Sequence, residues 1–287
     1  MSTAETEQSL RDEIARLKIQ LDSKSDATPA PPQDALPPLS SSPSHALLLL
    51  SDSALPLGSF AFSSGLESYL AHHPSRTPPP IQPFLSLALQ TLATTTLPYL
   101  LAAYRDPTRL QELDDTLDAC ILCHVTRRAS TAQGRALLTV WERAFCNTLE
   151  ACTEEKEILA ALSAELKKAS LPKTSSLDVA DGETTVWGHF APIWAVVTRA
   201  LDVPMGDSAH VFLLNHAKAV LSAAVRASVV GPYQAQAVLG SDWLREEMAR
   251  LLRENWEVKI EEAGQGVPAM DLWVGRHELL YSRIFNS

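Results

Sequence analysis

The chain lacks the short motifs by which many enzymes bind a nucleotide or activate a serine. It contains no G-x-x-x-x-G-K-[ST] phosphate loop, no G-x-G-x-x-G dinucleotide fingerprint and no G-x-S-x-G nucleophile elbow. The alternation of polar and apolar residues that is typical of β-strands is also scarce. We therefore expect a protein that is not an enzyme and whose fold is not built on a sheet.

Basic residues are in short supply. Lys and Arg number 24 against 34 Asp and Glu, which gives a net charge of −10. A chain this acidic lacks the positive surface that binds nucleic acid, and an anionic membrane would repel it. It also has no apolar run long enough to span a bilayer, and no secretory signal pattern at its start. We expect a cytoplasmic protein without nucleic-acid or membrane partners.

Cysteines are few, namely Cys120, Cys123, Cys146 and Cys152, and a cytoplasmic location would keep them reduced. Cys120, Cys123 and His124 have the C-x-x-C-H spacing of haem attachment, which also resembles half a zinc site. No second cysteine pair follows at zinc-finger spacing, and the motif lies in an apolar helical pattern. We expect core packing and no stably bound cofactor; a metal or redox site at these three residues is the alternative.

The composition divides the chain into three parts. Residues 1–24 carry four apolar residues at helical spacing, which predict a short amphipathic helix: Leu10, Ile14, Leu17 and Leu21. Such a helix either makes a small coiled-coil contact or frays when alone. Residues 25–44 are rich in Pro and Ser and are expected to be a disordered linker. A folded domain should occupy residues 45–287, with a loop insertion near 170–185.

The apolar pattern of this domain predicts an all-α fold, a single helical bundle. The predicted helices cover residues 83–105, 112–131, 133–150, 154–169, 187–201, 207–228 and 232–262. Pro98 should bend the first of them, and Pro232 suits the first turn of the last. The helix over 207–228 is apolar around most of its circumference, as in a core or at an interface. We predict that Phe212, Leu213 and Val220 contribute to a dimer contact.

Residues 51–69 form the most informative stretch and are called the N-terminal motif below. Pro56 fixes its own φ angle and Gly58 permits a tight bend. Ser64 and Glu67 have the spacing of a capping box ahead of a short helix. Phe60 and Phe62 are expected to anchor the turn on the core.

The N-terminal motif resembles the signature of the UreF family of urease accessory proteins, S-x-A-L-P-x-G-x-F-x-x-S-x-G-L-E. The matching residues are Ser53, Ala54, Leu55, Pro56, Gly58, Phe60, Ser63, Gly65, Leu66 and Glu67. The C-terminus is similar to the family ending M-x-x-x-x-x-x-H-E-x-L-Y-S-R-L-F-R-S. Its matches are Met270, His277, Glu278, Leu280, Tyr281, Ser282, Arg283, Phe285 and Ser287. Ile284 replaces a Leu, and Asn286 stands where Arg is common.

Weaker resemblances to the same family lie between the two ends. Arg128, Gln133 and Gly134 fit an R-x-x-x-x-Q-G segment, and residues 188–190 fit a G-H-F segment. Residues 224–231 fit A-V-R-x-x-x-x-G, although Pro232 follows where the family usually has Gln. The resemblance covers about residues 45–287.

Membership of this family would imply an all-helical homodimer. UreF proteins bind the accessory protein UreD (also called UreH) and then the GTPase UreG, and the assembly engages apo-urease. They resemble a regulator of the GTPase and promote nickel insertion, and nickel itself has been proposed to pass through the complex. The resemblance therefore implies a scaffold. A generic helical adaptor unrelated to urease is the alternative.

The resemblance and the composition of the C-terminus together suggest partner-binding residues. Arginine and aromatic side chains are enriched in binding hot spots, and the C-terminus carries both. We predict partner contacts by His277, Glu278, Tyr281, Arg283 and Phe285. Phe285 and Leu280 have the alternative role of closing the core. A second contact surface is predicted at Glu67 and Tyr69, provided that both face outward.

Overall fold

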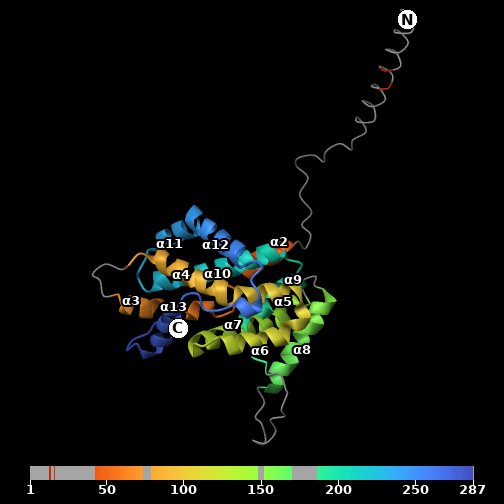
Figure 1. Cartoon of the computed structure of the whole chain (residues 1–287), viewed down its shortest axis with the longest axis horizontal. Helices are drawn as coiled ribbons and strands as arrows, with labels where there is room; N and C mark the ends of the chain where they lie inside the picture. Colours follow the sequence, from red (N-terminus) through yellow and green to blue (C-terminus); the bar gives the residue numbers. More distant parts are fainter. Residues whose placement is uncertain are drawn as a thin grey trace, which may run out of the picture. The chain divides into compact units, whose positions relative to one another are not determined.

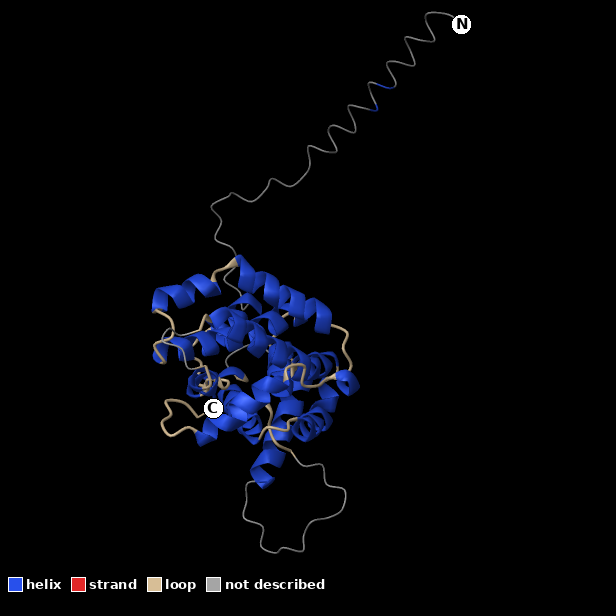
Figure 2. Ribbon diagram, turned by 60° about the vertical axis from the view of Figure 1, so that its left-hand side comes forward, coloured by secondary structure: helices blue, strands red, loops and turns tan. Residues whose placement is uncertain are grey.

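The computed structural model describes residues 43–73, 79–147, 152–169 and 186–286, together with Glu13 and Arg16. The chain divides into two units, residues 1–40 and 41–287, and the second unit holds the elements described below. Within the described residues every regular element is helical, which confirms the all-α prediction (Figure 2). Glu13 and Arg16 are helical, but the rest of the predicted N-terminal helix lies outside the described residues, as do the predicted loop at 170–185 and most of the linker.

The helices of the second unit follow one another along the chain (Figure 1). They are α2 (Pro43–Ser51), α3 (Leu66–Ala71), α4 (Ile81–Thr95), α5 (Leu97–Arg105), α6 (Leu110–Cys120), α7 (His124–Val140), α8 (Thr153–Ala169), α9 (Phe190–Ala200), α10 (Met205–Arg226), α11 (Pro232–Leu239), α12 (Asp242–Asn255) and α13 (Pro268–Arg276). Short 3-10 turns occur at Ser59–Ala61, Pro107–Arg109, Ile260–Glu262 and His277–Leu279, and a π turn at Trp141–Phe145 follows α7.

Helices α9 and α10 form the centre of the bundle. α9 packs on α5, α7 and α8, while α10 packs on α2, α4, α5, α11 and α12. Because α10 is enclosed by helices of its own chain, Phe212, Leu213 and Val220 are buried in the core. They offer no surface to a second copy, so the predicted dimer contact through these residues is corrected to core packing. Helices in a core and helices at an interface both lack a polar face, so the sequence pattern alone does not distinguish them.

The predicted helix boundaries are partly confirmed. The bend at Pro98 is present, because α4 and α5 meet at an angle of 40° and Pro98 lies in the first turn of α5. The predicted break at residue 132 is wrong, since α7 runs through it; the chain instead leaves the helix at residues 121–123. There the Arg127 guanidinium donates to the carbonyls of Asp118 and Ile121, so a side chain ends α6 without Gly or Pro.

The predicted helix over 232–262 is also divided. Pro232 does open α11 in its first turn, but α11 ends before Gly240. Ser241 then caps α12, its hydroxyl accepting the N–H of Leu244. Among the described residues, no single helix is long and apolar enough to cross a membrane, although the bent pair of α4 and α5 reaches that length and composition when taken together.

The start of α9 is clamped to α6 and α7. The Asp114 carboxylate accepts the backbone N–H groups of Trp187, Gly188 and His189 at 2.6 to 3.0 Å. Gly134 lies directly beneath, where an added Cβ would stand 2.1 Å from the Gly188 carbonyl oxygen. The backbones of α7 and the α9 start therefore touch, and residue 134 has no room for a side chain.

A cavity of about 350 Å³, partly open to the surface, lies among α4, α7, α10 and the N-terminal motif. Its lining includes the imidazole of His216 on α10 and the hydroxyl of Thr91 on α4. The His216 Nε2 and Thr91 Oγ1 atoms are buried and have no hydrogen-bond partner among the described residues. Burial removes the His216 ring from water, which favours its neutral form.

We expect Gly134→Ala to destabilise the fold severely. A methyl group at this position meets backbone rather than a flexible side chain, so α7 and α9 must separate, which costs about 3 kcal/mol or more. Gly206→Ala is the matched control, since it also lies in a helix but has open space around the new Cβ. Urea unfolding followed by circular dichroism compares the two. Equal midpoints for both variants would contradict the close contact.

We also expect His216 to make stability depend on pH. Burial lowers its pKa from 6.5 to about 4. Between these values the unfolded chain binds more protons than the folded chain, so the free energy of unfolding falls as the pH drops through this window. His216→Gln should make that fall shallower in urea titrations across the window. Part of the slope should persist, because burial also lowers the pKa of His189. Parallel curves for variant and wild type would refute the assignment.

Candidate protein-binding site

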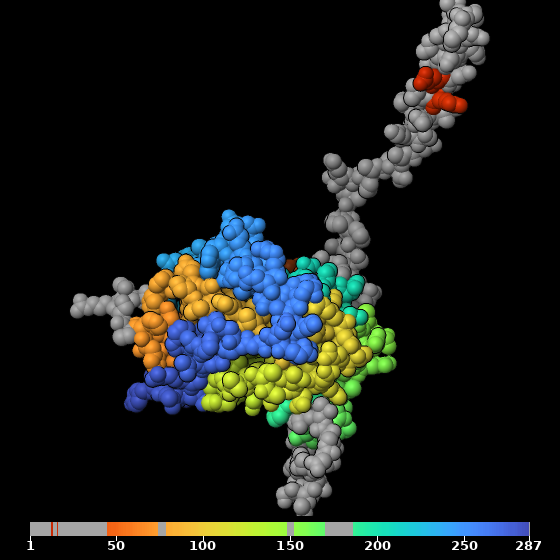
Figure 3. All heavy atoms as spheres, in the orientation of Figure 1, coloured from red at the N-terminus to blue at the C-terminus, as the bar shows by residue number. Residues whose placement is uncertain are grey.

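The C-terminal tail (residues 277–286) lies across the N-terminal motif and the first half of α7. Asn286 N–H donates to the carbonyl of Ala61 at 2.8 Å, and the Arg128 guanidinium donates to the carbonyl of Asn286 at 3.2 Å. Figure 3 shows this tail in dark blue, beside the orange of the first helices and the yellow-green of α7. The two ends of the folded domain therefore meet at one place.

Glu67 holds the tail by its backbone. Its carboxylate accepts the N–H groups of Ile284 and Phe285, at 2.8 and 3.1 Å, and its side chain is only 11% exposed. The predicted capping box of Ser64 and Glu67 is consequently wrong. Gly65, in the left-handed region at φ 81°, is the N-cap of α3, and the carboxylate that a capping box needs is bonded to the tail.

Phe285 is the apolar anchor of the tail and is 4% exposed. The Arg226 guanidinium lies 4.2 Å from the centre of its ring, a cation–π contact, and also donates to the carbonyl of Phe60. The buried ring of His277 donates from Nε2 to the carbonyl of Phe285 at 3.0 Å. His277 and Phe285 thus face the protein interior. Phe285 has the alternative role given above, closing the core, whereas Leu280 is only half-buried.

Glu278 joins the tail to the start of α7. Its two carboxylate oxygens lie 2.6 Å from His124 Nε2 and 2.8 Å from the Arg128 guanidinium. The hydrogen bonds from His124 and Arg128 lower the pKa of Glu278, so the carboxylate keeps its charge in mildly acidic solution. The Arg128 guanidinium therefore bonds to two groups of the tail, the Glu278 carboxylate and the Asn286 backbone carbonyl.

The second predicted surface, at Glu67 and Tyr69, is not an outward face. Tyr69 is buried, with its ring 4.9 Å from those of both Phe84 and Trp273, and Glu67 is occupied by the tail. The second residue of this six-residue helix, Glu67, faces the tail and the fourth, Tyr69, faces the core, which spacing alone does not reveal. Phe60 was expected to anchor the turn on the core, but its ring is exposed.

Four of the exposed tail residues have large side chains, and together they are called the exposed tail face: Leu279, Tyr281, Arg283 and Ile284. Tyr281 is fully exposed, and Arg283 makes no hydrogen bond or ion pair with any described residue. Large apolar side chains gathered on one short exposed stretch are typical of a protein-binding surface. Of the predicted partner contacts, Tyr281 and Arg283 are accessible in this chain.

The weaker family matches meet the tail and the N-terminal motif in space. Gln133 accepts a hydrogen bond from the Ser59 hydroxyl at 2.8 Å, and Arg128 and Arg226 bind the tail directly. Sequence reasoning identified these three residues as matches but assigned them no role. All three residues lie in segments that resemble the family, which marked them as candidates. The spacing of these segments along the chain did not show that they meet in space.

The C-x-x-C-H segment does not form a common site. Cys120 accepts a hydrogen bond from the Tyr99 hydroxyl, Cys123 packs with Val125 and Val274, and His124 binds Glu278. The expected buried helical face is wrong for Cys120, which lies at the helix end and is exposed. Across the described ranges, no group of three or more His, Cys, Asp and Glu side chains is placed to hold a metal ion.

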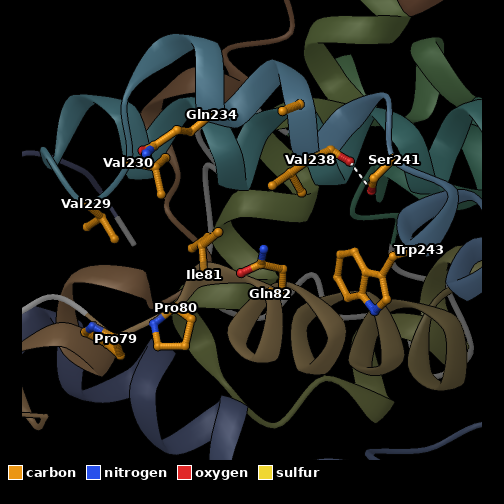
Figure 4. Close-up of a pocket in the computed structure, with 11 residues that line it drawn as sticks. Pro79, Pro80, Ile81, Gln82, Val229, Val230, Gln234, Val238, Ser241 and Trp243 are labelled. Carbon is orange, nitrogen blue, oxygen red and sulfur yellow. Dashed lines mark hydrogen bonds between the residues drawn. The ribbon is translucent and has the colours of Figure 1, made fainter.

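An open groove lies between the start of α4 and helices α11 and α12 (Figure 4). Its volume is about 510 Å³, and Ile81, Val238 and Trp243 contribute to its apolar wall. None of its lining residues is charged, and its polar side chains are those of Gln82, Gln234 and Ser241.

Comparison with known proteins decides the family. The UreF family model matches residues 80–241, which is more than half of the chain. The chain belongs to the UreF family. A UreF-like urease accessory protein of Schizosaccharomyces pombe, itself described as uncharacterized, is 34% identical over 85% of this chain and 97% of its own length.

Relatives from other organisms support the assignment to UreF. Urease accessory protein 6 of Cryptococcus neoformans is 26% identical over 85% of this chain and 96% of its own length. Urease accessory protein F of Arabidopsis thaliana is 29% identical over 83% of this chain and 90% of its own length. Both relatives are urease accessory proteins by name, and the alignments span nearly their whole length.

We expect Glu67→Gln to loosen the tail without unfolding the UreF domain. An amide replaces one of the two accepting oxygens with an N–H donor, so one tail N–H loses its acceptor. Hydrogen exchange at Ile284 and Phe285 should accelerate at least about tenfold, which corresponds to about 1.4 kcal/mol. Glu254→Gln, an exposed change on α12, is the control. Unchanged exchange at both amides would show that Glu67 does not retain the tail.

Proposed function

We propose that this chain is a non-enzymatic scaffold of urease maturation in the cytoplasm. In this proposal it binds a UreD/UreH-type accessory protein and a UreG-type GTPase, acts as a homodimer, and promotes nickel insertion into apo-urease. The observation that carries the proposal is the docked tail, whose backbone is bound by its own domain while Tyr281 and Arg283 point away from it.

The geometry of the tail suits a partner surface. A segment already fixed by Glu67, Phe285 and Asn286 loses less conformational entropy on binding than a free terminus does. Tyrosine and arginine are the residue types that most often carry binding energy at interfaces. The exposed tail face therefore combines a rigid support with side chains that have no role in the isolated chain.

The charge of the residues around the tail suggests what kind of partner surface would bind there. The chain carries a net charge of −10, yet Arg276 and Arg283 are exposed on or beside the tail, and the Glu278 carboxylate is already paired with Arg128. The exposed tail face is therefore a basic, aromatic patch on an acidic protein. A partner that presents carboxylates around an apolar socket would complement it.

The proposal assigns the chemistry to the partners. The GTPase would hydrolyse nucleotide, under the regulation of this chain, and nickel would be the cargo of the assembly rather than a resident cofactor of this scaffold. The absence of phosphate-loop and nucleophile motifs from the sequence agrees with that division of labour.

We expect Arg283→Ala to leave folding intact and to disrupt assembly. The guanidinium is exposed and unpaired among the described residues, so its removal should not change the urea midpoint. A hot-spot contact is worth at least about 2 kcal/mol, so the affinity for the UreD/UreH-type partner should fall about thirtyfold. Arg253→Ala, an exposed arginine on α12, is the control. Sizing-column co-elution with UreD/UreH-type and UreG-type proteins measures the loss.

Two outcomes would contradict the proposal. Full co-elution of the Arg283→Ala variant would remove the tail from the interface. Failure of the wild-type chain to associate with either partner would favour a generic adaptor. Deletion of the gene in its host should abolish urease activity, and restoring the wild-type chain should recover it more fully than restoring Arg283→Ala.

A further inference from the structure

The cavity among α4, α7, α10 and the N-terminal motif is too large to be an ordinary packing defect. Its volume is about 350 Å³, whereas protein interiors contain few voids larger than a water molecule. An engineered apolar cavity of about 150 Å³ is enough to bind benzene, and small-molecule sites begin at roughly 300 Å³. The space therefore suits a small organic molecule, such as one with a medium-length alkyl chain.

The wall of the cavity is mainly apolar and comes from distant parts of the chain. Buried side chains of α6, α10 and α13 contribute to it, among them Leu117, Phe212 and Met270. Phe60 and Leu122 also line the cavity, yet they are 66% and 85% exposed, so they lie at its mouth. A molecule that enters from solvent thus exchanges water for apolar side chains, which favours binding.

Two polar side chains in this wall have no hydrogen-bond partner among the described residues. The atoms concerned are Nε2 of His216 on α10 and Oγ1 of Thr91 on α4, and both are buried. A buried polar atom without a partner costs free energy, which a ligand that bonds to it recovers. A neutral imidazole nitrogen donates or accepts according to its tautomer, and a hydroxyl group can do either. A ligand hydroxyl therefore matches His216 in both tautomers, and Thr91 as well.

The charges around the cavity favour an uncharged ligand. The charged lining residues are Asp52, Asp271 and Lys218, and the Lys218 ammonium already donates to the carbonyl of Ser51 at 2.7 Å. His216 adds no charge at neutral pH, because burial lowers its pKa to about 4. A carboxylate on the ligand would meet two carboxylates and an ammonium that is already bonded, and any buried charge without a partner is costly.

We propose that this cavity binds an uncharged, mainly apolar organic molecule that carries one hydroxyl group, such as a medium-chain alcohol. The apolar part of the ligand packs on the wall, and its hydroxyl bonds to His216 or Thr91. Ser59 and Gln133, whose hydrogen bond joins the N-terminal motif to α7, line the same cavity. A bound molecule therefore braces the region that receives the tail.

This inference goes beyond the scaffolding role proposed above, since it assigns a small-molecule site to the chain itself. It needs no partner protein, so a failure of the ligand to bind would leave the scaffolding proposal unaffected. Failure of assembly would likewise leave the ligand site unaffected.

A displacement titration on the full, tag-free chain tests the proposal. N-phenyl-1-naphthylamine, an uncharged dye that fluoresces strongly away from water, is bound first, and 1-octanol is added as the competitor. We expect saturable dye binding that 1-octanol reverses. Octanoate and octylammonium should compete at least about tenfold more weakly, because each would bring a charge into the cavity. Equal competition by the three compounds, or no saturable dye binding, would overturn the proposal.

Variants of the lining residues locate the site. Ala219→Phe places a ring in the cavity and should abolish dye binding, whereas Ala164→Phe, at an exposed alanine of α8, should leave it unchanged. The double variant His216→Leu, Thr91→Val removes both unpartnered polar atoms. Its affinity for 1-octanol should fall at least about fivefold, the value of one hydrogen bond, while that for toluene should not change. An unchanged affinity for 1-octanol would contradict the role of the two polar atoms.

Cysteine labelling gives an independent readout of the place of binding. Cys120 is exposed and lines the cavity, whereas Cys152 is exposed just before α8 and lies outside the lining. Saturating 1-octanol should protect Cys120 from iodoacetamide and leave the labelling of Cys152 unchanged. Urea midpoints measured without ligand check that each variant is folded. Unprotected Cys120, or full dye binding by a folded Ala219→Phe variant, would show that the molecule binds elsewhere and would refute the assignment.

Discussion

The backbones of α7 and the α9 start are in direct contact, and the position of the candidate site depends on this. Gly134 supplies the space and the Asp114 carboxylate fixes the opposing loop through three N–H groups. With α7 held at this point, its preceding turns carry Gln133 and Arg128 to the N-terminal motif and the tail. A rigid contact deep in the bundle therefore sets the geometry of a surface some distance away along the same helix.

Much of the fold follows from local signals in the sequence. Proline at residues 98 and 232 and the apolar periodicity placed the bend of α4–α5 and the start of α11 correctly. The break at residues 121–123 could not be predicted in the same way, because no Gly or Pro marks it and α6 ends where the Arg127 side chain bonds to the carbonyls of Asp118 and Ile121. Gly240 and Ser241 are residue types that commonly end and begin helices, so they marked the division of α11 from α12. The continuous apolar pattern around them nevertheless led to the prediction of a single helix.

The candidate site was predictable in its residues but less so in their roles. Tail residues were identified from composition and family resemblance, yet the division between inward His277 and Phe285 and outward Tyr281 and Arg283 appears only in three dimensions. Glu67 is the clearest case. Its spacing from Ser64 satisfies a local rule, but the carboxylate bonds to backbone groups 217 and 218 residues away, and sequence-local reasoning has no access to such a partner.

The tail contact joins the earliest and latest parts of the folded unit. Synthesis proceeds from the N-terminus, so the residues that receive the tail, among them Ala61, Glu67 and Arg226, exist long before Phe285 emerges. Contacts between such distant positions form only after the intervening chain is in place. A UreF chain that has lost Phe285 or the residues that receive it therefore has no docked tail, and the exposed tail face forms only in the last step of the chain's own folding.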